Sequence, residues 1–260
     1  MSAVLSHDAA RSARGRFLLR IEDIDPGRSR EAHVTAIEED LRWLGLDWDG
    51  PVVRQSERLA LYAEMLERLK RLGLVYPCFC TRADIARSVA APHGPEGALY
   101  PGTCRALTRP ELDRPHAWRL DIARAQAITG PLRWHDARAG AVEAHPELLG
   151  DVVLARKDAP VSYHLAVTVD DAAQGVTDVI RGRDLFLSTH IHRLLQALLD
   201  LPVPAYSHHA LLIGPDGQRL AKRHGALSLA ELRAQGVDPE NIKTAFRNGV
   251  APLGFRLSDA

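Results

Sequence analysis

The stretch Phe17-Leu-Leu-Arg-Ile-Glu-Asp-Ile-Asp-Pro26 decides the fold class of this 260-residue chain. Its apolar first half, residues 17–21, predicts a short strand, and three carboxylates follow before the proline ends it. Ligands of open α/β sheets bind at the carboxyl ends of strands, so these carboxylates are candidates for a binding site. Alternation places Glu22 opposite Asp23, where Glu22 could hold an ammonium or a hydroxyl group. A solvated acidic turn or a helix cap is the alternative.

Periodic segments around this stretch predict an α/β layer architecture. A helix tail is expected over 9–16, before the strand. After the strand, one amphipathic helix ends at Gly45 and aligns four apolar residues on one face: Val34, Ile37, Leu41 and Leu44. A second follows Ser56, ends at Gly73 and turns five side chains inward: Tyr62, Met65, Leu66, Leu69 and Leu72. We expect further strands over 151–156, 163–171, 176–182 and 211–213, and a helix over 189–199. Two short helices should complete the chain, the first capped by Ser228.

The composition excludes several classes of protein. Lys and Arg total 33 and so do Asp and Glu, so the formal net charge is zero, which excludes a strongly basic protein that wraps nucleic acid. Hydrophobic residues make up 46% and charged residues 25%, as in globular domains. No run of 18 apolar residues is present, and the first residues lack the apolar core of a signal peptide. We expect a cytoplasmic protein with no membrane segment.

The three cysteines gather around a loop-rich insertion over 76–105. Cys78, Cys80 and Cys104 fit reduced thiols of a cytoplasmic protein better than disulfides. Three thiolates can bind one tetrahedral ion, and zinc takes four ligands. His93 and Tyr100 are both in range as the fourth ligand, and chemistry alone favours His93 because imidazole is the commoner ligand. The alternative is that the thiols are small buried hydrophobic groups.

Two further segments carry charge in unusual places. Tyr163 and Arg181 each lie in an expected strand with polar neighbours. A guanidinium there needs an anion, which is either Asp184 or the carboxylate or phosphate of a ligand. The segment 217–224 presents three cations and a histidine after a turn, and its Lys222 could contact a polyphosphate. An exposed basic loop without a ligand is the alternative.

These segments, in this order, resemble the glutamyl-queuosine tRNA(Asp) synthetase family, a shortened relative of glutamyl-tRNA synthetase. The resemblance rests on 20–25 (Arg-Ile-Glu-Asp-Ile-Asp), the cysteine insertion, 151–158, Tyr163-His-Leu-Ala-Val, Val179-Ile-Arg-Gly-Arg-Asp-Leu and the lysine loop. It implies a Rossmann-like class I aminoacyl-tRNA synthetase catalytic domain with a small zinc-binding insertion. The implied reaction first forms glutamyl-adenylate from L-glutamate and ATP, with Mg²⁺, and releases pyrophosphate. It then transfers glutamate to queuosine in the anticodon loop of tRNA(Asp).

The resemblance also implies roles for individual residues. Three match positions that bind L-glutamate: Glu22, Tyr163 and Arg181. Lys222 matches the catalytic, ATP-contacting lysine. It lies in the signature loop Arg219, Leu220, Ala221, Lys222 and Arg223, where Ala221 replaces the usual hydroxyl residue. Four residues match the ligands of one zinc ion per chain: Cys78, Cys80, Tyr100 and Cys104. The resemblance therefore moves the expected fourth ligand from His93 to Tyr100.

The expected organisation follows from this match. Residues 1–75 begin the catalytic domain, 76–105 form the zinc insertion, 106–226 complete the domain with a connective insertion, and 227–260 form a helical segment. We expect a monomer without an anticodon-binding domain. Family members begin with an Arg-Phe-Ala-Pro-Ser-Pro-Thr-Gly strand and a His-containing signature, and this chain begins after them. We therefore expect the 260 residues as written to form adenylate poorly. A non-catalytic or inactive paralogue, or a fragment of a discriminating glutamyl-tRNA synthetase, are the alternatives.

Overall fold

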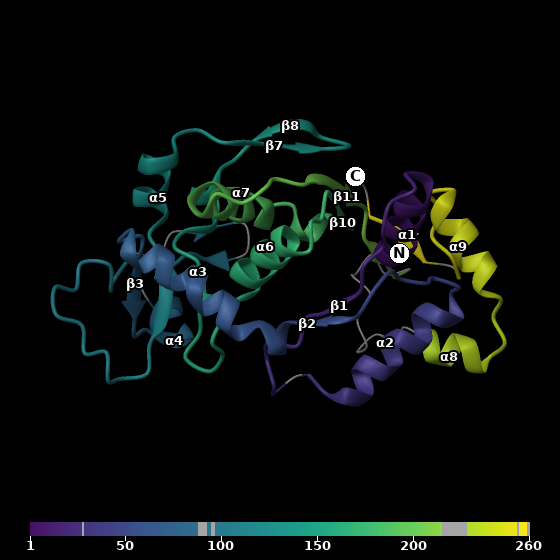
Figure 1. The fold of residues 1–260 in the computed structure, drawn as a ribbon, viewed down its shortest axis with the longest axis horizontal. Helices are drawn as coiled ribbons and strands as arrows, with labels where there is room; N and C mark the ends of the chain where they lie inside the picture. The colour runs from purple at the N-terminus through teal and green to yellow at the C-terminus, as the bar shows by residue number, and fades with distance from the viewer. Residues whose placement is uncertain (28, 88–92, 95–96, 215–227, 254, 259–260) are drawn as a thin grey trace. The chain divides into compact units, whose positions relative to one another are not determined.

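The computed structural model describes residues 1–260 except 28, 88–92, 95–96, 215–227, 254 and 259–260. The chain forms two compact units. The first unit contains residues 1–54, 179–184 and 207–260, and the second contains 55–178 and 185–206. Both units combine helices with strands, as expected (Figure 1).

The first unit is built on a β-α-β element. Strand β1 (Arg20–Ile21) pairs in parallel with β2 (Val53–Arg54), and helix α2 (Glu31–Trp43) connects them. Helix α1 (Ser2–Ser12) packs with α9 (Pro239–Arg247), and α2 packs with α8 (Leu229–Ala234) (Figure 1). Strand β12 (Leu212–Ile213) pairs antiparallel with β13 (Arg256–Leu257). The core of the unit is apolar: Val4, Leu19, Ile21, Val34, Leu41, Leu44, Leu46, Leu232, Ile242 and Phe246.

Local signals set several helix boundaries of the first unit. Gly45 follows α2 with φ +67°, a left-handed conformation that glycine adopts without strain. Ser228 caps α8 in a capping box with Glu231, as the sequence predicts. Two details differ from expectation. Only the last two residues of the 17–21 run pair as a strand, and Ile37 is 43% exposed, at a hollow that it lines together with Val34.

In the described part of the chain, the second unit contains three sets of paired strands, the smallest being β4 with β5, and several helices. Strands β3 (Val75–Cys78), β6 (Ala117–Leu120) and β9 (Val153–Ala155) form an antiparallel sheet in the order β3-β6-β9. Strand β7 (Arg133–Asp136) pairs with β8 (Gly140–Glu143) and, at Tyr206, with β11 (Ala205–His209). The helices are α3 (Leu59–Arg71), α4 (Arg82–Arg87), α5 (Ile122–Thr129), α6 (Tyr163–Ala173) and α7 (Ser188–Leu199). Shorter elements of the described part of the unit are β4 (His93–Gly94), β5 (Gly97–Ala98), η1 (Gln55–Arg58) and η2 (Pro146–Leu149).

The prediction of a strand over 163–171 is wrong, because this segment forms helix α6. Its β-branched residues favour a strand, but every residue from Leu165 to Asp171 is buried. A short apolar run that is buried on all sides has no distinctive period, so its pattern cannot separate a core strand from a core helix. The strand expected over 176–182 is confirmed as β10 (Asp178–Gly182).

In α3, Tyr62, Leu66 and Leu69 are buried as expected, whereas Leu72, just beyond the helix, is 47% exposed.

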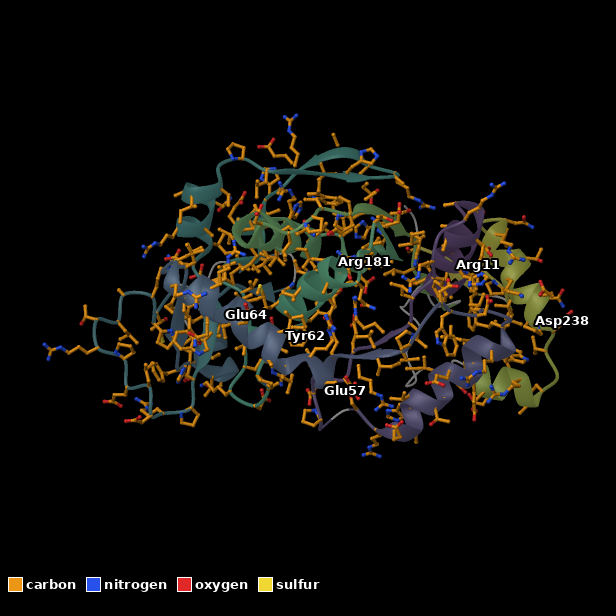
Figure 2. All side chains as sticks on the ribbon, in the orientation of Figure 1. Arg11, Glu57, Tyr62, Glu64, Arg181 and Asp238 are labelled. Atoms are coloured by element: carbon orange, nitrogen blue, oxygen red, sulfur yellow. The ribbon has the colours of Figure 1, made fainter. Side chains whose placement is uncertain are left out.

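One buried carboxylate joins three segments of the second unit. Asp170, on α6, is fully buried and accepts hydrogen bonds from the hydroxyl of Tyr62 (2.6 Å) and from Nε2 of Gln55 (2.9 Å). Arg58 adds an ion pair at 2.7 Å from its Nε. Figure 2 labels Tyr62 on its helix α3. Burial, followed by the bond to Asp170, raises the pKa of Tyr62, which keeps its hydroxyl protonated as a donor.

We predict that Asp170→Asn lowers the free energy of unfolding by about 3 kcal/mol or more, because it removes the charge that these donors surround. Urea denaturation of the purified protein measures the change. Glu64→Gln, which neutralises an exposed carboxylate on α3, is the control and should change stability by less than about 0.5 kcal/mol. Equal stability of the two variants would show that the buried charge is not needed.

Candidate metal centre and substrate-binding residues

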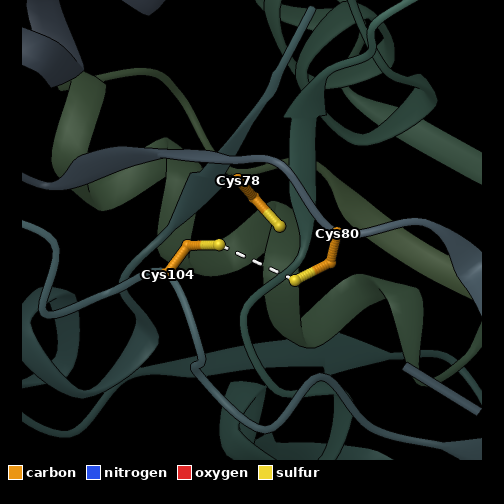
Figure 3. A group of neighbouring side chains, drawn as sticks. All are labelled: Cys78, Cys80 and Cys104. Atoms are coloured by element: carbon orange, nitrogen blue, oxygen red, sulfur yellow. Dashed lines mark hydrogen bonds between the residues drawn. The ribbon is translucent and has the colours of Figure 1, made fainter. Parts of the chain in front are cut away.

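The three cysteine thiols meet at the end of strand β3. Cys78 is its last residue, Cys80 follows two residues on, and Cys104 comes from a later turn. The three Sγ atoms lie within 4.8 Å of one another, and those of Cys80 and Cys104 are 3.7 Å apart (Figure 3). Tyr100 is buried beside them, with its hydroxyl oxygen 3.8 Å from Sγ of Cys80 and accepting a bond from the backbone N–H of Cys104.

This spacing fits one tetrahedral metal ion. Zn–S bonds are about 2.3 Å long, so two thiolates on one tetrahedral ion lie about 3.8 Å apart. The 3.7 Å between Sγ of Cys80 and Sγ of Cys104 matches that value, and the hydroxyl oxygen of Tyr100 lies at a similar distance, 3.8 Å, from Sγ of Cys80. Of the two expected fourth ligands, the structure brings Tyr100 to the thiols. His93 belongs to β4, and its side chain lies outside the described part of the chain.

The surrounding fold holds the cysteine loop in place. The ammonium of Lys157 donates to the backbone carbonyls of Phe79 (2.7 Å) and Cys80 (3.2 Å). The guanidinium of Arg119 lies 3.9 Å above the ring of Tyr100, at cation–π distance. These contacts fix the loop through groups that are not themselves candidate ligands. A site that is ordered in this way resembles a structural metal centre more than an open catalytic one.

The thiols differ in acidity. Burial, with a smaller contribution from the neighbouring Cys104, raises the pKa of Cys80 to about 11. Burial also acts to raise the pKa of Cys104, but hydrogen bonds with Tyr100 and with the backbone of Phe79 lower it below its usual value. Metal thiolates form from deprotonated sulfur, so binding of an ion here should release protons.

In the first unit, Glu22 directly follows β1 and is exposed, as the sequence predicts. Its carboxylate lies 3.7 Å from the guanidinium of Arg20. Both side chains line a hollow of about 330 Å³, together with Ser29, Arg30 and His33 near the start of α2. Glu22 is therefore placed where a small ligand can reach it.

Arg181 lies next to the end of β10 and is only 9% exposed, although it is an arginine (Figure 2). Its Nε donates to Nε2 of His208, on β11, at 3.2 Å. The following residue is enclosed, since a Cβ on Gly182 would lie 2.8 Å from Cδ2 of Leu211 and closer still to the carboxylate of Asp184. The backbone that carries Arg181 is therefore held firmly. His208 belongs to none of the sequence motifs, and its burial next to a buried arginine is visible only in the structure.

Tyr163 belongs to the second unit, where it is the first residue of α6 and partly buried. Its ring packs edge-on against the rings of His164 and His192, with centroid distances of 5.7 and 5.6 Å. Nδ1 of His164 and Nε2 of His192 are 3.3 Å apart. Tyr163 thus begins a helix whose other end is tied down at Asp170.

The signature loop lies outside the described residues, and this includes Arg219, Leu220, Ala221, Lys222 and Arg223. Among the helices that the structure does describe, none is both long and apolar enough to cross a membrane.

Comparison with known proteins matches nearly the whole chain to tRNA synthetases. A family model described as "tRNA synthetases class I (E and Q), catalytic domain" matches residues 1–258. A Glutamyl-Q tRNA(Asp) synthetase of Rhodobacter capsulatus is 49% identical over 93% of this chain and 91% of its own length. One of Symbiobacterium thermophilum is 48% identical over 93% of this chain and 78% of its own. The crystal structure of a glutamate-tRNA synthetase from Elizabethkingia anophelis matches 97% of this chain and 58% of its own length, at TM-score 0.75 and 26% identity.

We predict that the protein, purified without added metal, carries close to one divalent metal ion per chain by elemental analysis. Cys104→Ala should lose most of this metal and lower the protection from hydrogen exchange over the segment around Cys78–Cys80, because a structural ion stabilises its own loop directly. Thr103→Ala, an exposed neighbour, is the control and should keep the metal. A metal-free protein of undiminished stability would contradict the site.

Proposed function

The chain belongs to the class I tRNA synthetase family for glutamate and glutamine, and from this membership we propose that it activates L-glutamate with ATP and transfers it to queuosine of tRNA(Asp). The observation that carries the proposal is the 49% identity to a Glutamyl-Q tRNA(Asp) synthetase over nearly the full length of both chains. The substrates are ATP, L-glutamate and tRNA(Asp) that contains queuosine. The protein works in the cytoplasm, where these substrates meet, and as a monomer.

The proposed reaction has two steps. In the first, a carboxylate oxygen of glutamate attacks the α-phosphorus of ATP, and pyrophosphate leaves. In the second, a hydroxyl of the queuosine ring attacks the carbonyl carbon of glutamyl-adenylate, and AMP leaves. The protein forms no covalent intermediate, so it accelerates both steps by orienting the reactants and by stabilising charge.

Three residues bind glutamate in this proposal. Arg181 meets a carboxylate, by its match to the family position, and its place near the carboxyl end of β10 supports the role because α/β sheets bind ligands at such strand ends. Glu22 holds the ammonium group at the end of β1. Tyr163 offers its hydroxyl from the start of α6. Lys222 contributes positive charge at the ATP phosphates, by its match to the family lysine. Mg²⁺ bound with ATP would supply further positive charge at those phosphates.

The metal in this proposal is zinc, with a structural role. The ligand set of Cys78, Cys80, Cys104 and Tyr100 is rich in thiolate, which favours zinc over magnesium or calcium. The four residues surround the turn between β3 and α4 within the proposed insertion 76–105, so the ion would fix that turn. The rest of the proposed domain division, 1–75, 106–226 and 227–260, follows the same family match.

The test of the function is the transfer of labelled glutamate to purified tRNA. The protein expressed from its own gene should label tRNA(Asp) from cells that make queuosine. It should not label tRNA(Asp) from cells that lack queuosine, and tRNA(Glu) serves as a second control. Labelling of tRNA(Glu) in preference to both would instead identify a discriminating glutamyl-tRNA synthetase.

We predict that Arg181→Ala weakens glutamate binding by about 1.5–3 kcal/mol, the scale of a hydrogen bond to a charged group. Calorimetric titration with L-glutamate and, separately, with ATP measures the effect, and ATP binding should change little. Arg183→Ala removes the same charge from an exposed position two residues along the chain and is the control. If Arg181→Ala weakened the binding of L-glutamate and of ATP equally, the role of Arg181 would be structural, such as pairing with Asp184.

A further inference from the structure

We infer that Asp151 is a positioning residue of the metal centre, because its hydrogen bonds hold the segments that carry the candidate ligands at the spacing that one ion needs. The inference rests on the metal centre proposed for the cysteine loop. It adds to that centre a residue that is not itself a candidate ligand, and it gives a role to the first residue of the motif 151–158.

Asp151 is a buried carboxylate, 3% exposed, that lies shortly before strand β9. Its Oδ2 accepts hydrogen bonds from the hydroxyl of Tyr76 and from Nε of Arg105, the latter at 2.9 Å. Its Oδ1 accepts from the backbone N–H of Ile122, the first residue of α5, at 3.1 Å. Its backbone carbonyl accepts from the guanidinium of Arg119 at 2.6 Å. A buried charge depends on its donors, so these bonds fix the groups that donate them.

Two of these donors are attached directly to thiol ligands. Tyr76 lies two residues before Cys78 on β3, so their side chains leave the strand on the same face. Arg105 follows Cys104 immediately in the chain. The single carboxylate of Asp151 therefore anchors the backbone on both sides of the cysteine loop, where it presents two of the three thiols (Figure 3).

The ring of Tyr100 is held by the same group of residues. The guanidinium of Arg119 lies 3.9 Å from the centre of this ring, and the ring of Tyr76 lies 6.5 Å from it at an angle of 31°. Tyr76 and Arg119 are opposite each other where β3 pairs with β6. A Cβ on Gly150 would lie 3.9 Å from the backbone nitrogen of Tyr100, so the turn before Asp151 approaches the same segment.

The other end of the motif reaches the remaining thiol ligand. Lys157 donates to the backbone carbonyls of Phe79 and Cys80 at 2.7 and 3.2 Å. Its ammonium is exposed, so water competes for these bonds. Asp151 is buried, and its bonds are shielded from that competition. Asp151 is therefore the stronger constraint of the two.

Preordered ligands bind an ion more tightly, because less of the chain has to be ordered when the ion arrives. Groups that hold the ligands of a metal site typically change its affinity by about 10–100-fold when they are replaced. The three Sγ atoms here already lie within 4.8 Å of one another. Loss of the Asp151 charge should therefore weaken metal binding while all four candidate ligands are still present.

The test uses three single variants and one double variant of the full chain. Asp151→Asn removes the charge but keeps the size of the side chain and the backbone carbonyl. Arg105→Gln removes one donor from a side chain that is 43% exposed, where the fold tolerates the change. Asp170→Asn is the matched control, since it also neutralises a buried carboxylate of the second unit, whose donors come from η1 and α3. The double variant combines Arg105→Gln with Asp151→Asn.

Competition with a chromophoric chelator gives the zinc dissociation constant of each variant, and urea denaturation gives its stability. We expect Asp151→Asn to weaken zinc binding about tenfold or more and Arg105→Gln about threefold or more. The double variant should bind zinc within about twofold of Asp151→Asn alone, because both changes break the same contact. Asp170→Asn should lower stability and keep zinc affinity within about twofold.

The absorption spectrum of the protein loaded with Co²⁺ in place of zinc adds a readout of ligand geometry. The unmodified protein and Asp170→Asn should share one tetrahedral thiolate spectrum, which Asp151→Asn should alter. Unchanged zinc affinity in Asp151→Asn, an equal loss in Asp170→Asn, or additive losses in the double variant would overturn the inference.

A second pair of variants decides the matter if Asp151→Asn does not fold. Tyr76→Phe and Arg105→Gln each remove one donor to Asp151 and leave the carboxylate in place. Unchanged zinc affinity in both would overturn the inference, and weaker binding in both would support it. Failure of the metal centre itself looks different, because the unmodified protein would then neither contain a metal ion nor bind added zinc.

Discussion

The carboxylate of Asp170 is the constraint on which the second unit depends. A fully buried charge is costly unless donors surround it, and Asp170 has the hydroxyl of Tyr62, the amide of Gln55 and the guanidinium of Arg58. These donors come from η1 and α3, so one carboxylate joins both elements to α6. A helix held in this way can neither slide nor rotate freely. Tyr163, two turns earlier on α6, is therefore presented in a fixed direction.

Arg181 shows the same physical rule in the first unit with the opposite sign of charge. It is buried on a strand whose next residue, Gly182, has no room for a side chain, and its Nε donates a hydrogen bond to Nε2 of His208 on β11. Asp170 forms an ion pair with Arg58 of its own unit. Buried charges of both signs are thus held by hydrogen bonds from other segments of the chain.

Much of this arrangement could be predicted from sequence because the signals are local. The spacing of Cys78, Cys80 and Cys104 predicted the thiol cluster, Ser228 predicted a helix cap, and the carboxylates after Ile21 predicted the polar end of β1. Two features could not be predicted from pattern alone. The segment that begins at Tyr163 contains β-branched residues and is buried on all sides, so tertiary burial decided its helical form. The partners of Asp170 and Arg181 come from distant parts of the chain, and no spacing in the sequence identifies them.

The central claim is that this chain delivers glutamate to a nucleoside within tRNA(Asp). The most direct measurement is the position of the glutamate in the product. After transfer of labelled L-glutamate, the tRNA is digested to nucleosides, which are separated and identified by mass spectrometry. The account predicts that the label is found on queuosine and is absent from the 3′-terminal adenosine. Label on the terminal adenosine, with unmodified queuosine, would contradict it.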